Sequence, residues 1–522
     1  MEIVKNRVKN QDDLALVKRK FARQYKISCP SNIELLKAYR KLVRVKKIKP
    51  FGEIENILRT RPIRSLSGIV NISVLTKPYP CPGQCLYCPT EKGIPKSYVS
   101  GEPAVERAKK LKYDPYLQVK KRIEMLELEG HPTDKIELRI VGGTWSFYPR
   151  KYQLWFIKRC FKACNDGEAA IETRSPRGDL VSRTLRKTQK INEKAKHRIV
   201  GLSIETRPDF INPEEIKRLR ELGVTMVELG VQSIYGEVLK LNRRGHGVKE
   251  IVGATKLLKD AGFKVLYQMM PNLPGSTPAR DLKMFKDLFA DPQFKPDLLK
   301  IYPCALVKKA QLYKLWKDGK YKPYTETQMI KLVRSIKKII PYYVRIQRIT
   351  RDIPSYSIVI GPAKISNLRQ LVAGCCKCIR CREVKGNYDP KEKLYLFRQD
   401  YNASGGKEIF LSFENKSRTK LYSLLRLRMC EENTSPHIAI IRELHTYGQS
   451  LEVRPLQDWR GLTSPVSPQH KGLGKRLIKE AERITKKEFG FRKLAVISGV
   501  GVRDYWRKLS YKLKDTYMIK EI

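Results

Sequence analysis

The stretch Cys81-Pro-Gly-Gln-Cys85-Leu-Tyr-Cys88 decides how the rest of this 522-residue chain is interpreted. It places three cysteines on one short segment, in the pattern C-x3-C-x2-C. Three thiolates can hold three irons of a 4Fe–4S cluster. The fourth iron then has no protein ligand, so it can bind S-adenosylmethionine and reduce it to release a 5′-deoxyadenosyl radical. Cys81, Cys85 and Cys88 are therefore the predicted cluster ligands and are counted among the catalytic residues.

Two other kinds of metal site also use closely spaced cysteines. Zinc sites are usually built from two C-x2-C pairs, and no second pair lies near residues 81–88. Ferredoxin-type clusters need a fourth cysteine. The observed spacing, with the aromatic Tyr87 just before the last cysteine, resembles the signature of radical-SAM enzymes. We favour that interpretation over zinc or an electron-transfer cluster.

Between about residues 66 and 350, apolar β-branched runs alternate with helical stretches. Strands are predicted at 69–75, 136–141, 198–204, 225–231, 264–269, 298–302 and 343–346, with helices between them at 116–128, 152–164, 213–222 and 248–261. Such alternation predicts an α/β fold with a parallel sheet and crossover helices. About six strand–helix units fit a partial (β/α)6 barrel, which is also the radical-SAM fold.

Polar or glycine-rich residues follow the predicted strands in order, at the barrel end where chemistry gathers. Gly142, Gly143 and Thr144 follow the second strand, Glu205 the third and Gln232 the fourth. Glycine lets a ligand approach the backbone closely, which suits the methionine amino group of S-adenosylmethionine. Glu205 could accept hydrogen bonds from the ribose hydroxyls or from that amine. A single glycine is explained by turn chemistry, but an ordered series after a cysteine loop is not.

A second cysteine group lies in the connector 351–390, as Gly374-Cys375-Cys376-Lys-Cys378-Ile-Arg-Cys381. Four thiols so close together favour a zinc site over a second iron–sulfur cluster. Cys376, Cys378 and Cys381 are the predicted zinc ligands, with Cys375 as the candidate fourth ligand. A zinc site here would pin the connector between two domains.

Residues 391–522 change character. Strands are predicted at 393–397, 409–413, 422–428, 438–447 and 493–497, with an amphipathic helix at 477–488. The helix is preceded by Gln469-His-Lys-Gly472-Leu-Gly474-Lys475. A glycine loop at a helix start offers backbone N–H groups to a pyrophosphate, although such a loop alone is a weak signal. In this order of elements it resembles the acetyl-CoA site of GNAT acetyltransferases, and it predicts a mixed α/β domain.

The charge points to a polyanionic partner. The net charge is +53, from 106 basic and 53 acidic residues, and residues 1–50 alone carry 15 Lys or Arg against 4 Asp or Glu. Nucleic acid is the favoured partner, because each neutralised phosphate releases a counterion. Residues 1–65 are expected to form a basic helical arm that binds RNA. We expect a cytoplasmic protein without a membrane segment, because no apolar run could span a bilayer and no signal peptide is seen.

Together these residues resemble the catalytic subunit of Elongator, including its single-chain archaeal and bacterial relatives. The match covers about residues 60–522 and includes Gly142-Gly-Thr, Gly201-Leu-Ser-Ile-Glu-Thr-Arg-Pro, Arg442-Glu-Leu-His-Thr-Tyr-Gly and Val496-Ile-Ser-Gly-Val-Gly-Val. The resemblance implies tRNA carboxymethyluridine synthase activity. The adenosyl radical would take a hydrogen from the acetyl-CoA methyl group, and the carbon radical would add to carbon 5 of the wobble uridine. Oxidation and thioester hydrolysis would follow, and an electron donor is needed.

The resemblance also implies where acetyl-CoA binds. By position, its contacts fall on Lys135, Glu443, Leu444, His445, Thr446, Gln469, Gly472, Leu473, Gly474, Lys475, Tyr505 and Trp506. Glu205 and Tyr505 join the three cysteines as candidate catalytic residues. Relatives often carry Tyr-Tyr where this chain has Tyr505-Trp506, so one hydroxyl is missing here.

Four units are therefore expected along the chain. They are a tRNA-binding arm at 1–65, a radical-SAM domain at 66–350, a zinc-binding connector at 351–390 and a GNAT-like domain at 391–522. The competing function is a protein lysine acetyltransferase whose iron–sulfur domain is structural. That enzyme would need a base for the amine, for which Glu443 is the candidate. Its basic substrates would be repelled by the basic surface.

Overall fold

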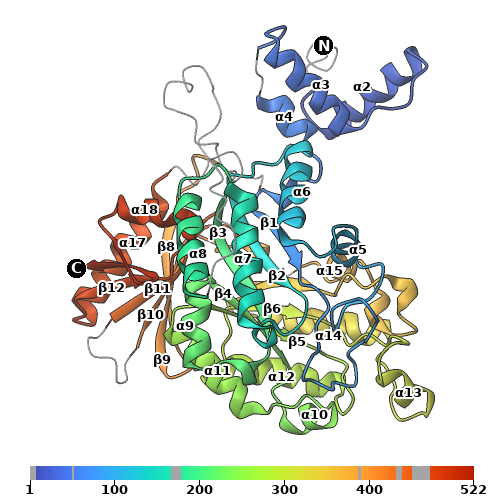
Figure 1. The fold of residues 1–522 in the computed structure, drawn as a ribbon, viewed down its shortest axis with the longest axis vertical. Helices are drawn as coiled ribbons and strands as arrows, with labels where there is room; N and C mark the ends of the chain where they lie inside the picture. The colour runs from blue at the N-terminus through green and yellow to red at the C-terminus, as the bar shows by residue number, and fades with distance from the viewer. Residues whose placement is uncertain are drawn as a thin grey trace.

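Two seven-stranded sheets organise the molecule. The computed structural model describes residues 8–49, 52–165, 178–374, 376–385, 389–430, 438–448 and 471–522. In Figure 1 one sheet and its helices fill the centre, the second sheet lies beside it at the C-terminal end, and a small helical unit projects from the N-terminal side.

The first sheet is parallel, and its strands are adjacent in chain order from β1 to β7. They are β1 Val70–Leu75, β2 Lys135–Val141, β3 Arg198–Thr206, β4 Met226–Gln232, β5 Lys264–Met269, β6 Leu298–Ile301 and β7 Arg345–Ile349. Each corresponds to a predicted strand, and the connections between them make the six units of a partial barrel. The predicted fold class is therefore confirmed for this half.

Helices cover the outer face of this sheet (Figure 1). The longer ones are α6 Pro115–Leu128, α7 Arg150–Asn165, α8 Gly178–Asn192, α9 Pro213–Glu221, α11 Val248–Asp260, α12 Pro278–Ala290 and α14 Glu326–Ile339. The shorter helices in this part of the chain are α5 Pro103–Lys110, α10 Gly236–Leu241, α13 Leu312–Lys317, α15 Leu368–Leu371 and α16 Ile379–Arg382. Capping residues set where several of these helices begin. The Asn212 side chain accepts from the Glu215 N–H at the start of α9, and Thr325 and Gln328 form a capping box at the start of α14.

The inward face of β2 is polar. Along β2, the residues facing the helices (Ile136, Leu138 and Ile140) are buried, whereas the alternate residues Glu137 and Arg139 keep about a fifth of their side chains exposed, 21% each. Strand residues alternate between the two faces of a sheet. The helix-facing side therefore joins the hydrophobic core and the inward side of β2 carries charge, whereas β4, β5 and β6 place a small apolar cluster on their alternate face, made of Met226, Leu266 and Leu298.

The second sheet is mixed, with the order β13-β14-β12-β11-β10-β9-β8. Its strands are β8 Tyr395–Ala403, β9 Gly406–Glu414, β10 Leu421–Met429, β11 Ile438–Thr446, β12 Lys493–Val496, β13 Lys512–Lys514 and β14 Tyr517–Glu521. Only β11 and β12 pair in parallel. Helices α17 Leu473–Arg483 and α18 Arg503–Arg507 accompany it.

Three details of this domain differ from the sequence prediction. Strand β8 continues to Ala403 because Ser404 and Gly405, both with positive φ (50° and 70°), make a tight hairpin turn to β9. Helix α17 begins at Leu473 and passes into a π-turn at Ile484–Glu488. Strands β13 and β14 lie outside the prediction, because both are short: β13 is Lys-Leu-Lys, and β14 shows no regular apolar alternation.

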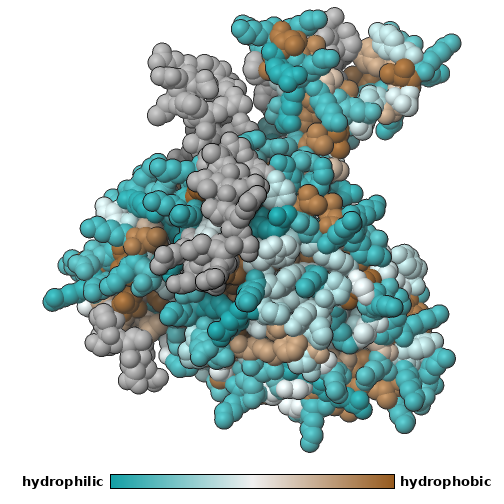
Figure 2. Space-filling view, in the orientation of Figure 1, coloured by the Kyte–Doolittle hydropathy of each residue, from teal (hydrophilic) through white to brown (hydrophobic). Residues whose placement is uncertain are grey.

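The N-terminal helices α2 Gln11–Gln24, α3 Asn32–Arg44 and α4 Gly52–Leu58 have a small core of their own. It contains Leu14, Leu36, Tyr39, Ile54 and Leu58. The unit is tied to the end of α6, since Arg40 donates to the Glu127 carbonyl (2.9 Å) and Arg59 to the Gly130 carbonyl (2.8 Å). The face shown in Figure 2 is largely hydrophilic. In the described ranges, no helix is long and apolar enough to cross a membrane.

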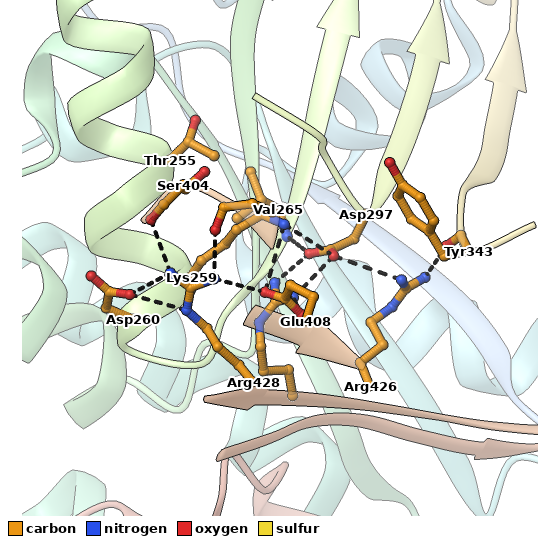
Figure 3. A network of polar contacts seen from close by, with 12 residues as sticks. Thr255, Lys259, Asp260, Val265, Asp297, Tyr343, Ser404, Glu408, Arg426 and Arg428 are labelled. Carbon is orange, nitrogen blue, oxygen red and sulfur yellow. Dashed lines mark hydrogen bonds and ion pairs between the residues drawn. The ribbon is translucent and has the colours of Figure 1, made fainter. Parts of the chain in front are cut away.

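A buried ionic network joins the two sheets (Figure 3). Asp297, just before β6, accepts from Arg442 of β11 at 2.5 and 3.0 Å. Arg442 also donates to Glu408 of β9, at 2.9 Å, and Glu408 accepts from Arg428 of β10 at 3.0 Å. Lys259 of α11 lies 3.7 Å from both carboxylates. Each of these five side chains is at most 1% exposed to solvent.

The network predicts a large stability effect for a minimal change. Glu408→Gln should lower the free energy of unfolding by about 3–5 kcal/mol, because it leaves buried cations without their counter-charge. Urea unfolding followed by fluorescence measures this loss. The same change at Glu124, whose pair with Lys121 is largely exposed (42% and 62%), should cost at most about 1 kcal/mol. Equal effects of the two substitutions would contradict the assigned role of the network.

Candidate active site and cofactor sites

The predicted cysteines open into one cavity at the carboxyl ends of the barrel strands. Its volume is about 280 Å³, and its lining includes Cys81, Cys85, Cys88, Gly143, Thr144, Glu205 and Gln232. These residues come from the ends of four different strands. The structure therefore brings together all but one of the residues predicted for this site.

Gly142, the remaining residue, lies at the edge of the site and has a backbone reason to be glycine. Its φ is +136°, and a Cβ there would overlap the Thr76 hydroxyl. That hydroxyl lies 2.8 Å from the Tyr148 hydroxyl. Gly142 thus lets β1 and β2 end close together, and it places Gly143 and Thr144 at the cavity wall.

The cysteine loop is shaped for a group larger than one ion. Two thiolates on the same zinc cannot be more than about 4.6 Å apart, because each Zn–S bond is about 2.3 Å. Within the part of the chain that the structure describes, only Cys376, Cys378 and Cys381 bring three potential ligand atoms within 4.8 Å of one another. The three sulfurs of the Cys81–Cys88 loop do not meet this limit, so at least one pair of them is farther apart than a single zinc ion allows.

Glu205 stands at the centre of a polar network in the cavity. Its carboxylate accepts from the Tyr98 hydroxyl (3.1 Å), the Gln268 amide (3.2 Å) and the Lys300 ammonium (3.4 Å). Burial opposes the charge on Lys300, but Glu228, Tyr302 and Glu205 outweigh it and raise the pKa of Lys300. The amine is therefore fixed as a cation, and it holds Glu205 as an oriented acceptor.

Several buried polar atoms beside the cysteines lack partners in the described structure. Gln232 Oε1 and Arg207 Nη1 are among them. Gln232 also has a positive φ of 69°, so its side chain is held at the end of β4 by a strained backbone. Orphaned buried groups are costly unless a ligand satisfies them. Together with three thiol donors, they fit an iron–sulfur cluster with a polar co-substrate.

Sequence reasoning missed the two arginines beside the cysteine loop. Arg244 donates to Cys85 Sγ at 3.4 Å, and Arg207 Nη1 would lie 2.5 Å from a Cβ on Gly83. Burial raises the pKa of the Cys85 thiol, but Arg244 outweighs it, and the net pKa is lowered. A signal existed, since Arg207 follows Glu205 in one motif. In a chain with 106 basic residues, however, two arginines do not stand out.

The second candidate site lies at the start of α17. Gly472 caps this helix with a left-handed φ of 71°. A Cβ on Gly474 would lie 3.3 Å from the Tyr505 hydroxyl, 3.5 Å from Thr446 Oγ1 and 3.8 Å from Leu444. The structure thus brings the end of β11, the glycine loop with Leu473 and Lys475, and α18 into one place. Gln469 lies outside the described residues.

The other residues predicted for this site have different surroundings. Trp506 is buried in the core of the second domain, where its ring packs against Tyr511. His445 Nε2 donates to the Ser67 carbonyl at 3.1 Å, just before β1. Lys135, the first residue of β2, lies by strand register beside the start of β1, at the same end of the barrel. Burial lowers the pKa of Lys135.

Charged residues inside the barrel link the two sites. Glu443 accepts from Arg426 (2.8 Å) and Lys264 (3.4 Å). Burial opposes the charge of Glu137, but Arg139, Lys264 and Arg345 outweigh it and lower the pKa of Glu137. Arg139 contacts Glu137 at 3.1 Å and also lines the cysteine cavity. An alternating series of charges therefore runs from the end of β11 to the cavity.

The connector cysteines form a compact group. The sulfur atoms of Cys376, Cys378 and Cys381 lie within 4.8 Å of one another, and Cys375 falls outside the described residues. The segment is fastened at both sides: the Ile379 N–H donates to Val344 before β7, and the Val384 N–H donates to Leu421 of β10. The connector therefore makes contact with both sheets.

The glycines of Val496-Ile-Ser-Gly-Val-Gly-Val serve packing between the domains. A Cβ on Gly499 would overlap the Val200 backbone, and one on Gly501 would lie 2.6 Å from Arg198 Cβ, both on β3. These glycines allow a close approach of the second domain to the barrel. This function could not be recognised from the motif alone.

Comparisons with known proteins agree with this architecture. The Radical SAM superfamily model matches residues 79–288, and the Radical_SAM C-terminal domain model matches residues 296–376. The "tRNA uridine(34) acetyltransferase" of Methanocaldococcus infernus is 45% identical, covering 97% of this chain and 94% of that protein. The human "Elongator complex protein 3" is 36% identical, over 97% of this chain and 93% of that protein.

One solved structure is similar throughout most of the chain. It is the archaeal Methanocaldococcus infernus Elp3 lacking its N-terminal residues (1-46), with 45% identity and a TM-score of 0.74. It covers 88% of this chain, and this chain covers 100% of that structure. A radical SAM domain implies S-adenosylmethionine and a 4Fe–4S cluster, which the cysteine cavity fits.

Proposed function

Because the chain belongs to the family of Elongator complex protein 3 and the tRNA uridine(34) acetyltransferases, we propose that it modifies the wobble uridine of tRNA as a carboxymethyluridine synthase. The observation that carries the proposal is the pairing of a three-cysteine cavity with a glycine-loop site in one two-domain body. The names of the relatives, which specify uridine 34, support the substrate.

In this proposal Cys81, Cys85 and Cys88 hold the 4Fe–4S cluster, and S-adenosylmethionine binds beside it. When bound, these groups supply a 5′-deoxyadenosyl radical, with electrons from an external donor. The chain's own part is orientation. Gly143 and Thr144 offer backbone and hydroxyl groups at the cavity wall, Glu205 accepts hydrogen bonds from the bound nucleoside or amine, and Gln232 supplies its free amide oxygen.

Acetyl-CoA is the proposed carbon donor. The backbone N–H groups at the start of α17 suit its pyrophosphate, because helix N-termini favour anions. The end of β11, from Glu443 to Thr446, would contact the pantetheine, and Tyr505 would lie near the thioester. Lys135 is proposed to reach the same ligand from the barrel side.

The net reaction joins the acetyl methyl carbon to carbon 5 of the uracil ring. The methyl group would give a hydrogen atom to the 5′-deoxyadenosyl radical, the new C–C bond would form, and the ring would lose its carbon-5 proton to solvent and one electron to the external redox partner, which balances the electron used to cleave S-adenosylmethionine. Water then hydrolyses the thioester, which leaves the carboxymethyl group and free CoA. The polar barrel interior, with Glu137 and Arg139 between the two sites, supports a path along which both reactants meet.

The tRNA is proposed to bind through the basic surface, with residues 1–65 as an arm. The excess of 53 positive charges supports this assignment. We assign residues 66–350 to the radical chemistry, 351–390 to the connector and 391–522 to acetyl-CoA. A single wobble base would have to be unstacked to enter the cavity, as base-modifying enzymes require.

The competing function, protein lysine acetylation, is disfavoured by the surroundings of its candidate base. Burial raises the pKa of Glu443, but Lys264 and Arg426 outweigh it, and the net pKa is strongly lowered. A carboxylate held by two cations is a poor acceptor for a proton from an amine, because general-base strength falls with pKa.

We also propose that Cys376, Cys378 and Cys381 bind zinc. Their sulfur spacing allows a common ion, and the contacts of the connector with both sheets give that ion a structural role.

The main proposal is tested by nucleoside analysis. Anaerobically reconstituted protein is incubated with tRNA, S-adenosylmethionine, a reductant and acetyl-CoA, and digested tRNA is examined by mass spectrometry. Carboxymethyluridine and 5′-deoxyadenosine should both form. Cys85→Ala should abolish both, because one cluster ligand is lost, whereas Cys164→Ala, at a cysteine of α7 that does not line the cavity, should change neither. Formation of an acetylated peptide without any modified nucleoside would contradict the proposal.

The acetyl-CoA site is tested by calorimetry without tRNA. Gly474→Val should weaken acetyl-CoA binding at least about tenfold, because the added methyl groups enter the space between Thr446 and Tyr505. Gly253→Val is the matched control, since a Cβ on Gly253 of α11 meets nothing within 4 Å. An unchanged affinity in a folded Gly474→Val protein would place the ligand elsewhere.

The zinc proposal is tested by metal analysis. The purified protein should contain about one zinc per chain, and Cys378→Ser should remove it because a three-sulfur site cannot spare a buried ligand. The thermal midpoint should fall at the same time, since the connector loses its anchor. Cys29→Ser should retain the metal and the midpoint. Full zinc content in Cys378→Ser would refute this ligand set.

A further inference from the structure

We infer that Arg244 and Arg207 form a buried cationic clamp on the Cys81–Cys88 loop, which balances the charge of the bound cluster and sets its reduction potential. This inference rests on the proposed cluster and adds to it two residues that are not its ligands. They act through the cysteines, so they are positioning and tuning residues.

Arg244 is a buried cation without a carboxylate partner among the described residues. It is 7% exposed and lies between α10 and α11. Its Nη1 donates to Cys85 Sγ at 3.4 Å, its Nη2 donates to the Gly230 carbonyl, and its Nε has no partner. A guanidinium keeps its charge even when buried, so an anion must compensate it. Among the described residues, the group it contacts that can carry negative charge is the Cys85 sulfur.

Arg207 approaches the same loop from the end of β3. Asp209 fixes its guanidinium through two hydrogen bonds, at 2.9 Å to Nε and 2.8 Å to Nη2. The remaining nitrogen, Nη1, is buried and has no partner in the described structure. Asp209 thus orients Arg207 so that its unpaired Nη1 lies beside the cysteine loop. The single carboxylate balances only one of the two positive charges of Arg207 and Arg244.

Gly83 makes room for this donor. A Cβ on Gly83 would lie 2.5 Å from Arg207 Nη1 and 3.6 Å from the sulfur atoms of both Cys81 and Cys85. The guanidinium therefore occupies the space beside the two sulfurs that any other residue at position 83 would fill. Since Gly83 has no positive φ, this packing is the reason for a glycine here.

A fixed cation favours the reduced cluster. Reduction adds one negative charge to a cluster that already carries three thiolates, and the attraction to nearby guanidinium groups grows with that charge. Hydrogen bonds to the sulfurs act in the same direction. Because S-adenosylmethionine must accept an electron from this cluster, the clamp determines how readily the cluster can be reduced beforehand.

The test measures the cluster itself and not the modification of tRNA. Iron and sulfide are counted per chain, and the midpoint potential is obtained from an anaerobic redox titration followed by electron paramagnetic resonance. Arg244→Gln should bind the cluster but hold about tenfold less of it reduced at a given potential, which for a one-electron couple is about 59 mV. Arg243→Gln, the same change at the exposed neighbour, should retain the wild-type potential.

Two further variants keep the test decisive. Arg244→Lys preserves the charge and should give a potential between wild type and Arg244→Gln. Gly83→Ala should displace Arg207 without altering a cysteine, and should also lower the potential. Should Arg244→Gln fail to hold iron, recovery of the cluster by Arg244→Lys supports the clamp, and no recovery together with a wild-type potential in Gly83→Ala refutes it.

An unchanged potential in iron-replete Arg244→Gln also overturns the inference. Wild-type protein that never assembles a cluster would instead overturn the proposed function, so the two failures are distinguishable.

Discussion

The architecture depends on one buried arginine, Arg442, which donates hydrogen bonds to both Asp297 and Glu408. The first carboxylate belongs to the barrel and the second to the other sheet, so a single guanidinium spans the boundary. Burial opposes the charge on Asp297, but Arg442, Lys259 and Arg426 outweigh it and lower its pKa. For Lys259 the effect of burial exceeds that of the nearby carboxylates, and its pKa is lowered to about 8. Each charged side chain of the network is costly to bury without its partner. The network therefore opposes sliding of one domain against the other and holds the two in one relative position.

That fixed position explains how the two sites face each other. Asp297 precedes β6 and Lys264 begins β5, so the second domain docks against the amino ends of the barrel strands. The cysteine cavity opens from the carboxyl ends of the same strands. The chemistry proposed for this chain needs reactants from both ends, and a hydrophobic barrel interior would separate them. On the side of β2 the inward side chains Glu137 and Arg139 are instead charged and partly exposed, and the apolar cluster of Met226, Leu266 and Leu298 lies on the other strands.

Much of the fold and site could be predicted from the sequence because the signals are local. The parallel strands are short segments rich in Val, Ile and Leu, and the cysteine spacing and strand-end glycines are short motifs. What could not be predicted depends on contacts across long distances. Arg442 touches Asp297 from 145 positions away, and Arg244 touches Cys85 from 159. An arginine in so basic a chain carries no local mark of burial. The two final strands were missed because they are short and their sequences show too few apolar residues to mark a buried strand.

The excess of positive charge has a clearer meaning once burial is known. Buried basic residues such as Arg428, Arg442 and Lys300 are each matched by buried carboxylates such as Glu408, Asp297 and Glu228. Burial therefore consumes acids and bases in similar numbers, and it cannot account for a two-to-one excess of base. The unmatched positive charge must lie on side chains that reach solvent, where it costs stability through mutual repulsion. A protein that keeps such a surface gains from it only when a polyanion is bound, and the release of counterions then supplies the affinity.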